Sequence, residues 1–226
     1  MPELPEVETV ARGLSSHIVG LSFQDLQFDW AKSFPNAPGE VDAFLIGSRV
    51  VGVRRRAKVL IIDLSTNYSL VIHLKMTGQM VYVNKDKRLK IKDERSGASG
   101  EERFGAGHPN DSLIGSLPDK STRVTFTFTN GANLYFNDFR KFGWVRLMPT
   151  IAIEELDFFK KVGPEPLDSD FTPKQFIERL MRRKNSNIKA VLLDQTVIAG
   201  VGNIYADESL WGAKIHPTKL VKDIPK

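Results

Sequence analysis

The chain has 226 residues, of which 41% are hydrophobic and 26% charged, proportions that are normal for a globular protein and exclude a disordered or fibrous chain. This length can bury a sizeable core and fits two modest domains. No apolar run approaches about 18 residues and the N-terminus is acidic, so neither a membrane span nor a signal peptide is predicted. We therefore expect a cytoplasmic protein that does not bind membranes.

Cysteine is absent, which excludes disulfides and thiolate metal sites, and the 4 histidines are scattered without ligand spacing. We therefore expect no metal in this chain. The formal net charge of +5 favours an acidic partner. Two basic runs, residues 54–58 and 179–189, carry much of that charge. Taken singly, each run is equally compatible with a solvated face.

The first segment in chain order predicts a helix. Val7, Val10, Ala11 and Leu14 recur at helical spacing, and Pro5 suits the first turn. Alternating patterns then predict strands at residues 21–28, 49–55, 58–64, 69–75 and 79–83. Residues 1–149 are therefore expected to form an antiparallel β domain with a flanking helix.

Two further features of the β domain can be predicted. The clearest hairpin joins residues 122–129 to 132–137 through Asn130-Gly131, a pair that suits a type I′ turn. Residues 84–118 are rich in charge, glycine and serine and follow neither period. We expect residues 84–118 to be an exposed, mobile insertion.

The pattern becomes helical after Pro149, so residues 150–226 are expected to form a second, helical domain. We interpret residues 163–166 (GPEP) as the end of a linker. A capping box at Thr172–Gln175 starts a helix, and the side chains expected to face inward from it are Phe176, Ile177, Leu180 and Met181. A second helix should carry Ile188, Val191 and Leu192, and a third should run from about Asn203 to Trp211 and end at Gly212.

The turn Gly200-Val201-Gly202 precedes the third helix. Two glycines before a helix N-terminus can present backbone N–H groups to a phosphate, and Asn203 would add an amide donor. A lone motif of this kind is more often an ordinary turn in which glycine allows positive φ. The basic stretch before it and Lys189 favour the phosphate site.

Four ordered motifs now combine. MPELPEVETV, KMTG preceded by His73-Leu74, NDFRKFG, and IKAVLLDQTVIAGVGNIYADESLW together resemble formamidopyrimidine-DNA glycosylase, the bacterial enzyme that removes 8-oxoguanine and ring-opened purines. The resemblance spans Met1 to about Pro217, apart from residues 84–118. It implies an α+β protein with an N-terminal β-sandwich and a C-terminal helix-two-turns-helix domain, acting as a monomer on damaged double-stranded DNA in the bacterial cytoplasm.

The resemblance implies that Pro2, once Met1 is removed, is the nucleophile. An α-amine has a pKa of about 7.7–8.0, so roughly a tenth is neutral at pH 7, whereas lysine is almost wholly protonated. A secondary amine gives a cationic iminium with the sugar C1′, which permits strand cleavage by β- and then δ-elimination. Glu3 resembles the general acid/base and Lys58 the catalytic lysine. The alternatives are a solvated terminus for Pro2 and a surface lysine for Lys58.

The remaining roles follow from the same resemblance. Met76, Arg140 and Phe142 match the residues that fill the void left by a flipped nucleotide. Both apolar members could instead belong to the core, although neighbouring glycines favour exposed loops. Lys189, Gly202 and Asn203 match phosphate contacts. Glu6 and His73 are supporting residues, and a first-turn acid explains Glu6 equally well.

The family continues into a four-cysteine zinc ribbon that is missing here. Either the sequence is truncated or this member has lost the ribbon; the apolar ending KLVKDIPK favours truncation, and we expect weaker DNA binding in both cases. Three other functions stay open. One is an endonuclease VIII-like glycosylase for oxidised pyrimidines, which usually carries glycine where this chain has Leu4. The others are a non-catalytic DNA-binding module and an unrelated β-sandwich interaction protein.

Overall fold

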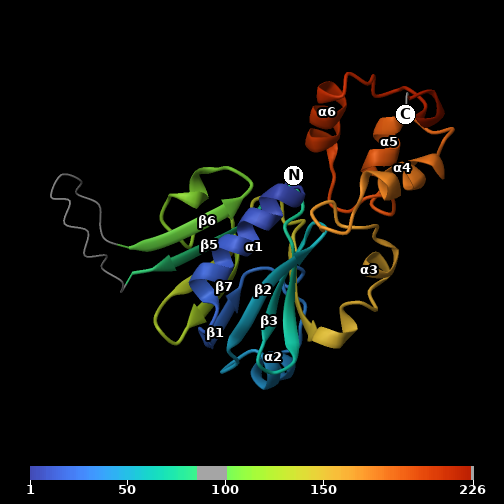
Figure 1. Ribbon diagram of the computed structural model, residues 1–226. Coiled ribbons are helices and arrows are strands. Elements are labelled where there is room, and N and C mark those ends of the chain that lie inside the picture. Colours follow the sequence, from blue (N-terminus) through green and yellow to red (C-terminus); the bar gives the residue numbers. More distant parts are fainter. Residues whose placement is uncertain (86–100, 225–226) are drawn as a thin grey trace. The chain divides into compact units, whose positions relative to one another are not determined.

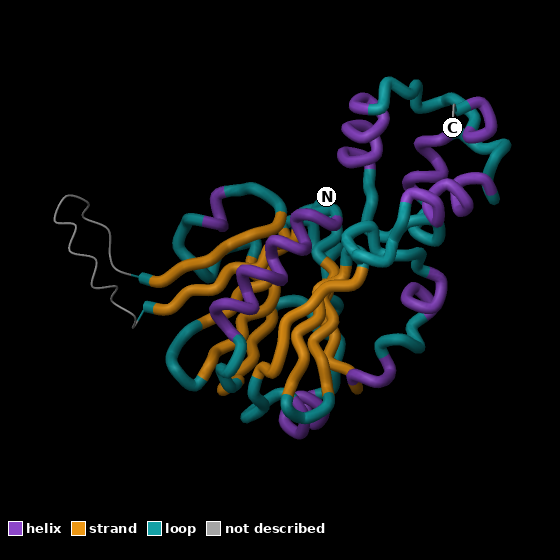
Figure 2. Tube along the Cα trace, in the orientation of Figure 1, coloured by secondary structure: helices purple, strands orange, loops and turns teal. Residues whose placement is uncertain are grey.

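The structure is a computed structural model that describes residues 1–85 and 101–224 (Figure 1). The chain divides into two compact units. The sandwich unit comprises Met1–Arg55 and Val59–Ile153, and the helical unit comprises Arg56–Lys58 and Glu154–Lys226. Figure 2 shows strands throughout the sandwich unit and helices throughout the helical unit. No helix among the described residues is long and apolar enough to cross a membrane.

The sandwich unit contains two sheets, which confirms the predicted β-sandwich. One sheet has the order β1-β7-β8-β5-β6 and the other has the order β2-β3-β4-β9. The first consists of β1 (Phe23–Phe28), β7 (Thr122–Phe128), β8 (Asn133–Asp138), β5 (Gly78–Asn84) and β6 (Glu102–Gly107). The second consists of β2 (Val50–Arg56), β3 (Val59–Leu64), β4 (Tyr68–His73) and β9 (Trp144–Pro149).

Side chains from alternate positions of both sheets form one apolar core. Leu60 and Ile72 of the four-stranded sheet and Tyr82, Phe126 and Phe136 of the five-stranded sheet are at most 1% exposed. Burying a side chain of this size stabilises a fold by roughly 1.5–3 kcal/mol. The sandwich unit also contains three short helical segments: α2 (Pro38–Phe44), η1 (Asp111–Leu113) and η2 (Thr150–Ala152).

The N-terminal helix α1 (Leu4–Ile18) buries the predicted apolar stripe in this core. Pro5 lies in its first turn, as expected. On the other side α1 packs against β6, where a Cβ on Gly13 would lie 1.9 Å from the ring of Phe104. Glycine at position 13 therefore lets the helix approach this strand closely, and His17 stacks on the same ring.

The prediction of an exposed, mobile insertion at residues 84–118 is wrong for its second half. Residues 102–107 form β6, which pairs with β5 from Gln79↔Gly107 to Asn84↔Glu102. The segment after β6 is tied down by Arg103, whose guanidinium donates to the carbonyl oxygens of Leu113 (2.9 Å) and Gly115 (2.6 Å). Composition misled here because the pairing partner and Gly13, which set the strand, are distant in sequence. Residues 86–100 lie outside the described residues.

The hairpin between β7 and β8 is present, but the predicted type I′ turn is wrong. Gly131 has a φ of 80°, whereas Asn130 is not among the residues with positive φ. Phe128 accepts from the N–H of Gly131 at 2.9 Å and donates to the carbonyl of Ala132 at 2.8 Å. These bonds define a three-residue loop, a type I turn followed by a left-handed glycine.

The helical unit consists of α3 (Asp157–Lys161), α4 (Pro173–Met181), α5 (Ile188–Leu193), α6 (Asn203–Gly212) and η3 (Val221–Asp223). The Thr172–Gln175 capping box is confirmed, and a small core forms around Ile188, Val191, Leu192, Ala206 and Leu210. The expected inward orientation is wrong for Ile177 and Met181, which are 46% and 37% exposed. The short helix buries only the part of its apolar face that carries Phe176 and Leu180.

The predicted end of α6 also needs correction. Gly212 is the last helical residue, and the left-handed conformation falls on Lys214, with a φ of 56°. The N–H groups of Ala213 and Lys214 close the last turn on the carbonyls of Ser209 and Trp211. The helix therefore ends one residue later than predicted, without using the freedom of the glycine.

Candidate active site and nucleic-acid interface

The chain is buried from its second residue onward at the N-terminus. Pro2 is buried and Glu3 is 2% exposed, whereas Met1 is 41% exposed. Glu3 and Glu6 form a capping box at the start of α1, in which the N–H of Glu3 donates to the Glu6 carboxylate at 2.8 Å. The alternative of a solvated terminus is therefore wrong. Glu6 has a defined role as well, because it fixes the backbone beside Pro2.

Met76 lies in the turn between β4 and β5 and is 40% exposed, and Phe142 lies in the turn between β8 and β9 and is 55% exposed. The alternative that both belong to the core is wrong. Arg140 is exposed in the same turn as Phe142, with its guanidinium carbon 5.0 Å from the centre of the phenyl ring. The two turns leave adjacent strands, because Gly78 of β5 pairs with Asp138 of β8.

Asp138 joins these two turns from beneath and was missed by sequence reasoning. It is fully buried, and one carboxylate oxygen accepts from the hydroxyl of Thr77 and from the N–H of Arg140 (3.2 Å). The other oxygen accepts from the N–H of Gly143 at 2.6 Å. A Cβ on Gly143 would lie 2.6 Å from the Phe136 ring and 3.1 Å from this carboxylate, so the close approach requires glycine.

His73, the predicted supporting residue, is the last residue of β4 and pairs with Trp144 of β9. Its Nδ1 accepts from the N–H of Lys75 at 3.0 Å, and the imidazole lies 6.0 Å from the indole of Trp144. Lys75 has a φ of 52°, a left-handed conformation that is uncommon for a residue with a side chain. The histidine therefore stabilises the start of the turn that carries Met76.

Lys58 groups with the helical unit and is only 8% exposed, so the surface-lysine alternative is wrong. Its ammonium donates to the carbonyl of Val201 at 2.9 Å, in the turn before α6. Pro2 and Glu3 belong to the other unit. Lys58 therefore contacts the predicted phosphate turn through its ammonium group.

Glu165 holds the segment that carries Lys58. It is 7% exposed, accepts from the N–H of Ala57 at 2.5 Å and pairs with Arg56 at 2.8 Å. Ala57 is fully buried with a φ of 51°, a conformation that costs alanine roughly 1–2 kcal/mol. The GPEP segment is thus more than the linker end that we predicted. An acid between two prolines was the only sign of this role in the sequence, and its burial became visible only in the structure.

Gln195 supports the turn before α6 and was also missed. Its amide nitrogen donates to the carbonyls of Val201 (2.8 Å) and Leu193 (3.1 Å), and its amide oxygen accepts from the N–H of Gly200 at 2.9 Å. Gly200 has a φ of 82°, whereas Gly202 is extended and serves as the N-cap of α6. Positive φ therefore explains Gly200 but not Gly202. An N-cap without a side chain leaves room for an anion at the positive end of the helix dipole.

The other predicted phosphate contacts lie on α5 and α6. Asn203 is exposed at the first position of α6. Lys189 on α5 forms an ion pair with Asp207 on α6, with its ammonium 2.7 Å and 2.9 Å from the two carboxylate oxygens. Lys189 is thus held near α6, but the carboxylate of Asp207 already compensates its positive charge.

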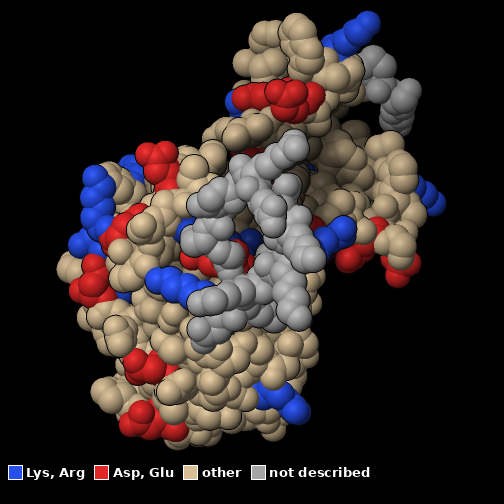
Figure 3. All heavy atoms as spheres, turned by 90° about the vertical axis from the view of Figure 1, so that its left-hand side faces the viewer, with Lys and Arg blue, Asp and Glu red and all other residues tan. Residues whose placement is uncertain are grey.

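The basic run at residues 54–58 is largely paired. Arg54 pairs with Asp63 and Arg55 with Glu8, and Arg56 pairs with Glu165 as described. The hydrogen bond from Arg55 lowers the pKa of Glu8, and it outweighs the opposing effect of burial. On the face drawn in Figure 3, basic and acidic side chains are interspersed. Net charge therefore does not by itself locate a DNA-binding surface.

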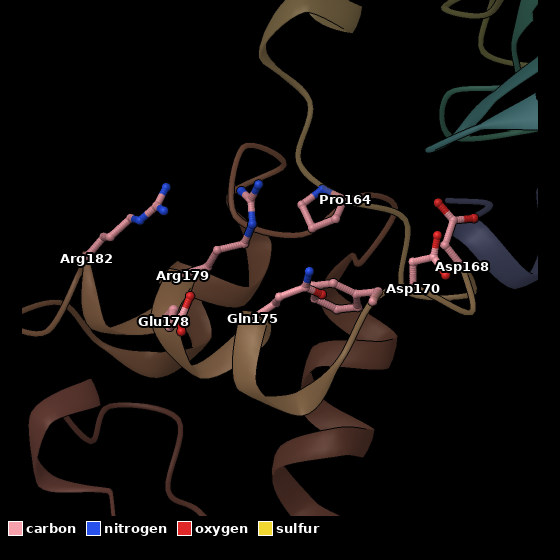
Figure 4. Close-up of a pocket in the computed structure, with 8 residues that line it drawn as sticks. Pro164, Asp168, Asp170, Gln175, Glu178, Arg179 and Arg182 are labelled. Atoms are coloured by element: carbon pink, nitrogen blue, oxygen red, sulfur yellow. The ribbon is translucent and has the colours of Figure 1, made fainter.

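A hollow of about 330 Å³ lies beside α4 (Figure 4). Its lining combines acids with bases: Asp168 and Asp170 lie on one side, and Glu178 lies with Arg179 and Arg182 on the other. None of the residues predicted for the site lines it. Charges of both signs line the hollow, so it offers no uniformly positive surface to a polyanion.

The residues present do not fit the family's four-cysteine zinc site, because the sequence contains no cysteine. The described residues likewise contain no group of three or more histidine, aspartate or glutamate side chains that could hold a metal ion.

A two-sheet β-sandwich that starts with a helix, followed by a helical unit with a glycine turn at a helix N-terminus, is the arrangement that the resemblance to DNA glycosylases implied. Two family models match the chain: the formamidopyrimidine-DNA glycosylase N-terminal domain over residues 1–145 and the H2TH domain of the same enzyme over residues 162–226. The chain belongs to the formamidopyrimidine-DNA glycosylase family. These are bifunctional base-excision-repair enzymes that remove oxidised purines and cleave abasic sites.

Individual relatives agree with this assignment. The formamidopyrimidine-DNA glycosylase of Chloroflexus aurantiacus is 41% identical over 96% of this chain and 67% of its own length, and that of Desulforamulus reducens is 37% identical over 99% and 71%. Among solved structures, the complex of Lactococcus lactis Fpg with DNA containing an abasic site has a TM-score of 0.78 and 32% identity, covering 99% of this chain and 71% of that one. MutM bound to DNA containing carbocyclic 8-oxo-G also has a TM-score of 0.78 and 32% identity, covering 100% and 73%.

Proposed function

We propose that the chain, once Met1 is removed, excises oxidised and ring-opened purines from duplex DNA through the nitrogen of Pro2. The burial of Pro2 and Glu3 carries this proposal, since chain termini are normally solvated and frayed. Glu6 holds the N–H of Glu3, and α1 is anchored in the core, so the amine would be presented on a rigid element. Rigid placement of a nucleophile lowers the entropic barrier to attack.

In the proposed reaction the lone pair of Pro2 forms a bond to the sugar C1′ and the bond from C1′ to the base nitrogen breaks. Opening of the sugar ring at O4′ leaves a cationic iminium between Pro2 and C1′. The iminium acidifies C2′, whose proton is removed while the C3′–O3′ bond breaks in β-elimination. A δ-elimination then breaks the C5′–O5′ bond, and hydrolysis of the iminium restores Pro2.

Glu3 is the proposed proton carrier for these steps, since it lies next to the amine in the chain. As an acid it delivers a proton to the departing base or to O4′, and as a carboxylate it takes one back. Proton transfer by one positioned group typically contributes about 10²–10⁴-fold in rate. Its burial beside a hydrogen-bonded backbone gives it a defined position.

The exposed residues of the sandwich unit supply the second part of the proposal. A base in the duplex must be flipped out before C1′ can be attacked, and the void left behind must be filled. Phe142 would wedge the stack, Met76 would occupy the gap, and Arg140 would hydrogen-bond the orphaned base. Exposed apolar side chains on anchored turns suit this use, because each is already outside the core.

The helical unit supplies phosphate contacts from Lys58, Lys189, Gly202 and Asn203. The known relatives in Lactococcus lactis bind DNA containing an abasic site or a modified Fapy-dG. We propose the same class of partner here: damaged double-stranded DNA bound by a monomer at the nucleoid of a bacterial cytoplasm.

Borohydride trapping tests the enzymatic proposal. Chain shown by mass to lack Met1 is incubated with an 8-oxoguanine:C duplex and reduced, and a covalent protein–DNA band is expected. The Pro2→Gly variant should cleave the strand more slowly while binding an uncleavable abasic duplex as before. Absence of the band from the processed chain would contradict the proposal. If Pro2→Gly lost binding to the same extent as strand cleavage, Pro2 would instead have a structural role.

A further inference from the structure

Met76 belongs to one turn of the sandwich unit and Arg140 and Phe142 to another, yet the proposed void filling needs all three side chains in one arrangement. The two turns are far apart in sequence and leave adjacent strands. Backbone pairing bounds the two turns at Gly78 and Asp138 in one sheet and at His73 and Trp144 in the other. The tips between these points depend on side chains for their relative position.

Asp138 and Thr77 provide that connection. The Thr77 hydroxyl, next to Met76, donates to the Asp138 carboxylate, and it also accepts from the N–H of Arg140 at 3.1 Å. The same carboxylate accepts from the N–H groups of Arg140 and Gly143, which lie on either side of Phe142. One buried group therefore restrains both turns.

The surroundings of Asp138 strengthen this restraint. The side chain is fully buried, and its backbone carbonyl accepts from the guanidinium of Arg123 at 3.0 Å. Arg123 is itself 4% exposed and pairs with Asp29, so the anchor reaches from β8 to the end of β1. Lys141 has a φ of 59°, a left-handed conformation that the hydrogen bonds on both sides of it hold in place.

We propose that Asp138 and Thr77 are a positioning pair, which fixes Met76 relative to Arg140 and Phe142 so that the three side chains enter the DNA as one preorganised group. This inference rests on the void-filling role proposed above. The pair itself touches no substrate. It acts by making the wedge rigid, because a displacement of about 1 Å in a positioning group can cost about 100-fold in rate.

The role makes a prediction that general stabilisation does not. Void filling matters when a stacked, paired base must be extruded, and it does not matter for an abasic site in single-stranded DNA. Loosening the pair should therefore slow excision of 8-oxoguanine from a duplex by roughly 10–100-fold. The lyase rate on a single-stranded abasic oligonucleotide should change less than about 2-fold.

The experiment uses Thr77→Val, which keeps the shape and removes the hydroxyl, and Asp138→Asn, which replaces one of the two acceptor oxygens with an NH2 donor. Both rates are measured for each variant in processed chain, together with the fluorescence of 2-aminopurine placed beside the lesion, which reports unstacking. Thr77→Ser should restore the wild-type duplex rate. Asp63→Asn is the matched control, since Asp63 accepts from Arg54 and Ser69 in the other sheet.

Phe142→Ala separates the two levels of the proposal. If Phe142→Ala excises from the duplex at the wild-type rate, the void-filling role itself is wrong. If Phe142→Ala slows duplex excision while Thr77→Val and Asp138→Asn do not, the positioning pair alone is wrong. A parallel fall of the duplex and single-strand rates in Thr77→Val would also overturn it. Should Asp138→Asn fail to fold, the Thr77→Val and Thr77→Ser comparison still decides.

Discussion

The sandwich unit and the helical unit both present short turns in which one polar side chain makes several hydrogen bonds to the turn, but the chemistry of that side chain differs. In the sandwich unit it is a carboxylate, Asp138, which only accepts hydrogen bonds. In the helical unit it is an amide, Gln195, which donates to two carbonyls and accepts from Gly200.

The difference follows from what each turn is proposed to meet. The wedge residues meet bases, and the charge of Asp138 is buried beneath its donors. The turn before α6 is proposed to meet a phosphate, and a second negative charge there would be repelled. Two like charges about 8 Å apart interact by about 2 kcal/mol at an effective dielectric constant near 20. A neutral amide supports the turn without this repulsion. Glu165 is a buried acid of the helical unit, and its charge is paired with that of Arg56.

The largest expected effect is the loss of stability when Glu165 is substituted. Glu165→Ala leaves the guanidinium of Arg56 and the N–H of Ala57 without this buried acceptor. Breaking such a pair from one side typically destabilises a protein by about 3–5 kcal/mol. Urea denaturation should show this loss, with a smaller one for Glu165→Gln, which keeps an acceptor for Ala57. Equal midpoints for Glu165→Ala and the wild type would show that Glu165 does not hold the Lys58 segment.

Gln195→Glu tests the contrast itself. The substitution keeps the acceptor for Gly200 and places a charge behind the turn. Affinity for a duplex with an uncleavable abasic site should fall roughly 10-fold or more, since about 1.4 kcal/mol corresponds to tenfold. Fluorescence anisotropy at fixed salt measures the affinity. Gln195→Leu is the companion variant, expected to destabilise by about 1–3 kcal/mol through unpaired backbone groups. Unchanged affinity in Gln195→Glu at pH 7 would remove the electrostatic reason for an amide.

Lys189 gives a smaller electrostatic effect. If it contacts a phosphate, Lys189→Ala should reduce the slope of log affinity against log salt by about 0.9. Asp207→Asn removes the acid that pairs with Lys189 and should strengthen binding by several-fold. Weaker binding in Asp207→Asn would mean that the acid positions Lys189 instead of competing for it. A salt slope unaltered by Lys189→Ala would place Lys189 outside the interface.

The smallest expected effect concerns pH. Asp194 directly precedes Gln195 in the chain. The hydrogen bond from the Thr196 hydroxyl lowers the pKa of Asp194. Because the folded pKa lies below the unfolded one, the stabilisation is present above the unfolded pKa, near 3.9, and is lost as the pH falls through the folded pKa. Asp194→Asn should lower the free energy of unfolding by about 1 kcal/mol relative to the wild type at pH 7, and by less at pH 3. A constant difference between the two pH values would contradict this linkage.

Periodic patterns predicted the regular elements well. The apolar stripe of α1, the alternation in β7 and β8 and the capping box before α4 each depend on a few neighbouring residues, so local sequence was sufficient. β6 was not predicted, because its place depends on pairing with β5 and on the space that Gly13 leaves for Phe104. The turn type at Asn130 failed for a similar reason, since loop length is set by the register of the two strands.

The site was predictable to the extent that its residues resemble a known motif. Pro2, Glu3, Met76 and Phe142 were predicted in this way. The burial of Pro2 and the exposure of Met76 and Phe142 then excluded the plain structural alternatives for these three residues. The supporting residues escaped notice. Asp138, Glu165 and Gln195 act through hydrogen bonds to backbone groups that are often distant in sequence, and no local pattern reports such bonds.

The measurement that tests the central claim most directly is the location of the trapped adduct. Processed chain is reduced with borohydride on an abasic duplex, the complex is digested, and the modified peptide is sequenced by mass spectrometry. The sugar remnant should be found on the nitrogen of Pro2, in the peptide that begins PELPEVETVAR. A remnant on Lys58, or on any other lysine, would contradict the assignment of Pro2 as the nucleophile.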